Sequence, residues 1–177
     1  MGAYDEIWGV AEDNYGIITS ARAKELGVSR QNMMAMLRRG VLTRLAQGVY
    51  QVKHHVPGVN DVYAVGVAMV GSSAYLRGAS VIAMLNLAPT NPGLLYVGSE
   101  DRVRRRLPDG FKVRDRMACK TTEYDGFEGI RCQALVDALK TARDEGAVEA
   151  DRIARAAKKA KEKGLLTDEE YAQFQGF

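Results

Sequence analysis

Three glycines near the N-terminus divide the start of the chain into short segments, and this spacing limits the fold more than any other feature. Gly16, Gly27 and Gly40 each follow a segment with apolar residues at helical spacing. These segments are residues 4–14, 20–26 and 30–39. Glycine is common just past a helix C-terminus, because it adopts the left-handed backbone conformation without strain. The spacing therefore predicts three short helices that together cover one small core.

A β-hairpin is expected after the third helix. Residues 41–45 and 48–52 alternate between apolar and polar side chains, and Ala46-Gln47-Gly48 forms the turn between them. A short extended piece at residues 17–19 separates the first two helices. The order helix, strand, helix, helix and hairpin is that of a winged helix-turn-helix, which places its last helix in the major groove of DNA.

The hydroxyl residues before the second and third helices predict their starts. Ser20 is expected to cap the second helix, and Ser29 the third, by accepting from backbone amides in the first turn. After Ser29 come a guanidinium and two amides, on Arg30, Gln31 and Asn32, which can pair with guanine and adenine edges. Met33, Met36 and Leu37 are expected in the core, whereas Arg44 and Gln47 would reach the DNA backbone or minor groove from the hairpin. The residues predicted to contact DNA in this domain are Arg22, Ser29, Arg30, Gln31, Asn32, Arg38, Arg39, Arg44 and Gln47.

The charge of this region supports a polyanionic partner. The whole chain carries a net charge of only +3. Between Gly16 and Lys53, however, there are seven basic residues and one acidic residue, Glu25, so this region carries a net charge of +6. One-sided charge of this kind supplies the salt-dependent phosphate contacts of DNA-binding domains. An alternative is a protein-binding module, in which Arg38 and Arg39 are merely a solvated helix end favoured by the helix dipole.

The composition changes after residue 57, so we expect two domains, residues 1–56 and 57–177. Charged side chains almost vanish between Val62 and Ser99. The apolar spacing predicts helices at 61–69, 73–87, 134–145 and 151–163, a last short helix opened by residues 167–170, and strands at 94–97, 111–114, 121–124 and 129–132. This order indicates an α+β chain, with helices flanking a short mixed sheet in the second domain.

A second basic stretch lies between Arg102 and Lys120, where eight basic residues and two acids again leave +6. Its densest part is Arg104-Arg105-Arg106. We include these three arginines among the predicted DNA contacts, as a phosphate-binding patch that repeats the charge of the first domain. A solvated loop is the alternative.

The remaining patterns favour a cytoplasmic, non-enzymatic protein. The longest uncharged runs are interrupted by prolines or too short to span a bilayer, so no membrane association is expected. Cys119 and Cys132 lack the spacing of a zinc site or a disulfide framework and are expected to be reduced thiols. His54 and His55 are adjacent in an extended segment, so their side chains point apart and we expect both at a solvent-exposed strand end. We predict no catalytic residue, no metal and no cofactor.

Four short stretches of the first domain resemble a known family, namely GIITSARA at 16–23, LGVS at 26–29, LRRGVLTR at 37–44 and GVY at 48–50. They are similar to the N-terminal domain of the AbiEi-type antitoxins. AYLRGASV at 74–81 resembles the helix that opens their second domain, and CQALVDAL at 132–139 resembles the helix after its sheet. The chain is shorter than many of these relatives, and it has Arg77-Gly78 where they often place a polar pair that includes His or Ser.

The resemblance implies an antitoxin of a type IV toxin–antitoxin pair that also represses its own operon. It implies that the winged domain binds inverted repeats in double-stranded operator DNA, with Arg30, Gln31, Asn32, Arg38, Arg39 and Arg44 at the groove-facing positions. It further implies that the second domain neutralises a nucleotidyltransferase-like toxin without a stable complex. The alternatives are a protein-interaction adaptor, a winged-helix transcriptional regulator without antitoxin activity, and an enzyme built on the second domain.

Overall fold

The computed structural model describes residues 2–117 and 125–176. The chain forms two compact units, Met1–Met69 and Val70–Phe177. The boundary between residues 56 and 57 stays a prediction. Cys119, Lys120 and the strand expected at 121–124 lie outside the described residues.

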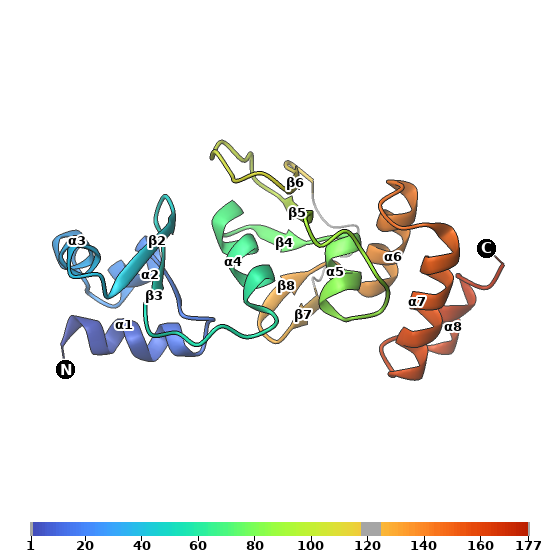
Figure 1. Cartoon of the computed structure of the whole chain (residues 1–177), viewed down its shortest axis with the longest axis horizontal. Helices are drawn as coiled ribbons and strands as arrows, with labels where there is room; N and C mark the ends of the chain where they lie inside the picture. The colour runs from blue at the N-terminus through green and yellow to red at the C-terminus, as the bar shows by residue number, and fades with distance from the viewer. Residues whose placement is uncertain (1, 118–124, 177) are drawn as a thin grey trace. The chain divides into compact units, whose positions relative to one another are not determined.

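The first unit is a winged helix-turn-helix, as the sequence predicts (Figure 1). Strands β1, β3 and β2 form an antiparallel sheet in that order, with a bulge in β2 between Arg44 and Ala46. The elements are α1 (Ala3–Glu12), β1 (Ile17–Thr19), α2 (Ser20–Glu25), α3 (Arg30–Arg38), β2 (Leu42–Ala46), β3 (Val49–Val52) and α4 (Asp61–Val70).

One apolar core joins the helices and the hairpin of the first unit. Ile7 from α1, Met36 from α3 and Tyr50 from β3 are buried in it. Met33 is buried and Leu37 half-buried against the same cluster, which confirms the predicted core face of α3. The cap expected at Ser20 is wrong, because the Thr19 hydroxyl accepts from the Arg22 amide and α2 begins at Ser20.

The second unit holds a five-stranded mixed sheet in the order β6-β5-β4-β8-β7. Strand β4 pairs antiparallel with β5 and parallel with β8. Helices α5, α6, α7 and α8 pack one against the next (Figure 1). The elements are β4 (Ala74–Leu76), α5 (Ala79–Met84), β5 (Leu95–Ser99), β6 (Phe111–Arg114), β7 (Asp125–Phe127), β8 (Ile130–Cys132), α6 (Leu135–Asp144), α7 (Ala150–Glu162) and α8 (Asp168–Ala172). The α+β class is therefore confirmed.

The single helix expected at 73–87 is wrong. Its first part is β4, an inner strand of the sheet, and only Ala79–Met84 is helical. Gly78, at φ +49°, turns the chain between the two elements, and its amide donates to the Gln133 side chain. Every residue from Ala74 to Val81 is buried, and a run of buried residues lacks the periodicity that separates a strand from a helix.

Candidate nucleic-acid interface

A groove in the first unit lies between the N-terminal turn of α3 and the β2–β3 wing. Four of the predicted DNA contacts line it, namely Ser29, Arg30, Arg44 and Gln47. The other lining residues are Ser20, Lys24, Val28, Met33, Met34, Gly48 and Tyr50. Residues far apart in the sequence, from the start of α3 and from the wing, thus line one concave surface.

Ser29 fixes the start of α3 at this groove. Its Oγ accepts from the Asn32 backbone amide at 3.1 Å, as the sequence predicts for a cap. Because this hydroxyl is engaged with the helix itself, Ser29 serves to position the first turn. The side chains of Arg30 and Gln31, which follow it, are exposed.

The outward face of α3 carries three residues at helical spacing, Gln31, Met34 and Arg38, opposite the buried Met33 and Met36. Met34 is 44% exposed, which is unusual for a large apolar side chain, and it lines the groove. The sequence reasoning did not single out Met34. The signal that could have found it is its spacing, because Met34 lies three residues after Gln31 and four before Arg38, on the face opposite the buried methionines.

Two predicted contacts, one on α3 and one directly after it, lie away from the groove. Asn32 and Arg39 line a separate shallow depression with Gly2, Ala3 and Tyr4 of the N-terminal segment. The structure therefore does not bring them together with Arg30 and Arg44, although both side chains are exposed.

Most cations of the first unit are not neutralised by neighbouring carboxylates. Within residues 2–117 and 125–176, no ion pair involves Lys24, Arg30, Arg38, Arg39 or Arg44. Arg22 differs, because its guanidinium pairs with Glu25 at 2.8 Å. Arg44 lies on the wing, where its Nε donates to the Ala46 carbonyl at 3.4 Å. Lys24 lines the groove and was not among the predicted contacts.

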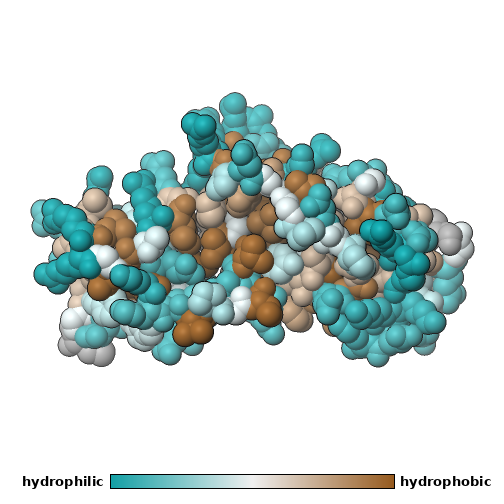
Figure 2. All heavy atoms as spheres, viewed as in Figure 1, coloured by the Kyte–Doolittle hydropathy of each residue, from teal (hydrophilic) through white to brown (hydrophobic). Residues whose placement is uncertain are grey.

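Arg104, Arg105 and Arg106 belong to the second unit, in the loop between β5 and β6, and their side chains are exposed. Figure 2 shows mostly hydrophilic residues at the surface of this loop. Its base is held by the Asp115 carboxylate, which accepts from the Val103 amide at 2.8 Å.

The solvent-exposed position expected for both histidines is wrong for His55. Its imidazole is mostly buried and pairs with Asp61, the first residue of α4. The ring also packs so closely on Gly16 that a Cβ at Gly16 would overlap it. His54 is exposed. Among the described residues, no group of three His, Cys, Asp or Glu side chains is placed to hold a metal ion.

The winged unit also matches a known family. Residues 10–53, from the end of α1 to just past β3, match the family model described as "Transcriptional regulator, AbiEi antitoxin". Residues 10–53 are thus similar to an AbiEi-type domain. This confirms the resemblance seen in the sequence, and the AbiEi family is one of transcriptional regulators rather than enzymes. Among curated proteins, none matches the chain. In the described parts of the chain, no helix combines the length and apolar character needed to cross a bilayer.

Proposed function

We propose that this protein is a sequence-specific DNA-binding repressor that acts in the cytoplasm as the antitoxin of a type IV toxin–antitoxin pair. The observation that carries the proposal is the groove between α3 and the wing, where Lys24, Arg30 and Arg44 meet without a carboxylate among the lining residues. A cationic groove beside a capped helix of this length suits the major groove of DNA.

The predicted contacts in the groove and beside it divide into two roles. Arg30 and Gln31, at the start of α3, would read base edges, since a guanidinium pairs bidentately with guanine and an amide with adenine. Arg44 and Gln47 on the wing, and Lys24 on α2, would bind phosphates or the minor groove. Contacts with phosphates outside the groove would come from Arg22, Arg38, Arg39 and the patch Arg104–Arg106. Asn32, in the first turn of α3, would add a further contact with DNA.

We extend the proposal to autoregulation by analogy with the AbiEi family. The winged unit would bind inverted repeats upstream of its own gene, while the second unit would antagonise a nucleotidyltransferase-like toxin without forming a stable complex. A reporter driven by the upstream DNA tests the first part, because the protein should lower its expression. Growth rescue of cells that express the neighbouring toxin gene tests the second.

Single substitutions at the groove test the DNA interface. Arg30→Ala should weaken binding of upstream DNA by about 1–3 kcal/mol, or roughly 5- to 150-fold, if Arg30 pairs bidentately with guanine. Lys158→Ala removes the same charge from an exposed position on α7 and serves as the matched control. Equal affinity of the two variants for upstream DNA would overturn the assignment of Arg30.

A further inference from the structure

A second cationic pocket lies in the second unit, at the edge of its sheet. Its lining includes Arg77, Tyr96, Lys112, Arg114 and Glu145. Tyr96 of β5 is directly opposite Lys112 of β6, and the Arg77 amide donates to the Tyr96 carbonyl. Directly opposed residues share one face of a sheet, as do residues two apart on one strand. Lys112 and Arg114 of the edge strand therefore lie on the same face as Tyr96.

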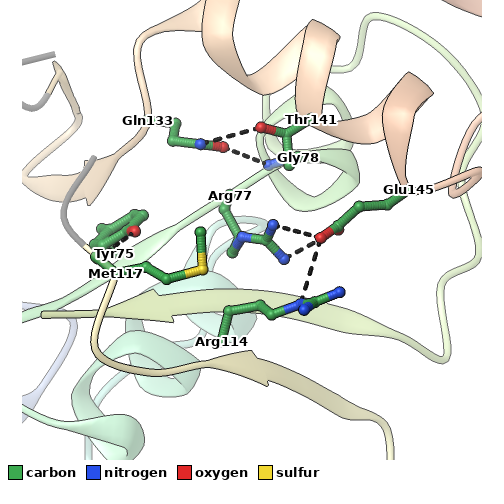
Figure 3. A network of polar contacts seen from close by, with 8 residues as sticks. All are labelled: Tyr75, Arg77, Gly78, Arg114, Met117, Gln133, Thr141 and Glu145. Carbon is green, nitrogen blue, oxygen red and sulfur yellow. Dashed lines mark hydrogen bonds and ion pairs between the residues drawn. The ribbon is translucent and has the colours of Figure 1, made fainter. Parts of the chain in front are cut away.

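One carboxylate, that of Glu145, forms ion pairs with two guanidinium groups in this pocket. Arg77 has a side chain only 6% exposed, and it donates to both oxygens of Glu145, at 3.0 and 2.6 Å. Arg114 approaches the same carboxylate with its Nε at 3.5 Å, beyond hydrogen-bond contact, and its side chain is 61% exposed (Figure 3). The bidentate pairing assigns Glu145 to the buried arginine and leaves Arg114 able to bind another anion.

The lining as a whole has an excess of positive charge. It contains three cations, Arg77, Lys112 and Arg114, and one acid, Glu145. Lys112 is exposed and, among the described residues, forms no ion pair. A ligand that complements this pocket should therefore carry at least two negative charges close together.

We propose that this pocket binds the phosphate chain of a nucleotide. A guanidinium fork and a flexible ammonium are the groups that proteins use to bind phosphate oxygens. Tyr96, which also lines the pocket, supplies aromatic surface next to these cations, as a nucleoside attached to the phosphates would need. Arg77 keeps Glu145 in place, while Lys112 and Arg114 contact the ligand.

Titration calorimetry of the full chain, freed of nucleic acid, tests this site with ATP, GTP, CTP and UTP as probes. We expect at least one nucleotide to bind and the matching nucleoside not to bind. Lys112→Ala/Arg114→Ala should weaken nucleotide binding at least about tenfold, because it removes the exposed charge-assisted contacts. Arg155→Ala/Lys158→Ala removes the same charge from exposed positions on α7 and should change the affinity less than about twofold.

Three outcomes would overturn the proposal. They are an absence of binding by all four nucleotides, an equal loss of affinity in the two double variants, and inorganic tripolyphosphate binding as tightly as the best nucleotide. The last outcome would leave a phosphate site but remove its assignment to a nucleotide. Far-UV circular dichroism of both variants verifies that they fold, which we expect because the four substituted side chains are exposed.

Discussion

Replacing Glu145 with glutamine should destabilise the second unit strongly, because it leaves the buried Arg77 without its counter-ion. The side chains of Arg77 and Glu145 are 6% and 22% exposed, and two hydrogen bonds join them. Breaking a buried ion pair by removing one partner costs about 3–5 kcal/mol. Since Glu145 keeps some contact with water and glutamine keeps one acceptor oxygen, we expect about 3 kcal/mol, the lower end of that range.

Urea unfolding followed by far-UV circular dichroism measures this cost. With a slope of about 2 kcal/mol per molar urea, a loss of 3 kcal/mol lowers the unfolding midpoint by roughly 1.5 M. Glu162→Gln, at an exposed position at the end of α7, is the matched control and should stay within about 0.5 kcal/mol of the unsubstituted chain.

A double-mutant cycle separates the ion pair from other effects of the substitution. Arg77→Met removes the buried charge, so adding it to Glu145→Gln should recover part of the lost stability, because no uncompensated cation then remains. The reasoning is refuted if Glu145→Gln costs less than about 0.5 kcal/mol, or if the two single losses simply add in the double variant.

Three further predictions follow from local contacts. Ser29→Ala removes the hydroxyl that caps α3 and should cost about 1 kcal/mol in urea unfolding, and no loss would contradict the cap. Gly98→Ala should cost about 1–3 kcal/mol, because its Cβ would overlap the ring of Tyr75, and an unchanged urea midpoint would show that the ring is free to move. The Lys161 ammonium is hydrogen-bonded to Asp168 at 2.6 Å and holds the pKa of that carboxyl below its ordinary value. The stability from this pair is therefore present near neutral pH and is lost as the pH falls through the lowered pKa. An NMR titration should show the lowered pKa, and Lys161→Ala should return it to the ordinary range.

The winged unit could be predicted from the sequence because its signals are local. Gly27 and Gly40 have positive φ values of 75° and 70°, as expected for residues that follow helices. Ser29 caps α3 as predicted, whereas the cap of α2 is Thr19 and not its neighbour Ser20. Two hydroxyl residues in succession give the same sequence signal, and only the backbone path decides which of them caps the helix.

The second unit was harder to predict because its signals are non-local. The strand β4 lies in a fully buried run, so its pattern also fits a helix. Arg77 was seen only as a departure from the family pattern, since its partner Glu145 lies 68 residues further along the chain. The pocket that these residues share with Lys112 and Arg114 depends on strand register, which spacing alone does not provide.

Fluorescence anisotropy with DNA from directly upstream of the gene tests the central proposal most directly. The unsubstituted protein should bind that duplex at least about 10³-fold more tightly than a scrambled duplex of the same length and composition, measured at one physiological salt concentration. The affinity for both duplexes should fall as salt increases, because the proposed phosphate contacts come from the cations Lys24, Arg30 and Arg44 of the groove. Equal affinity for the two duplexes would contradict sequence-specific DNA binding by the winged unit.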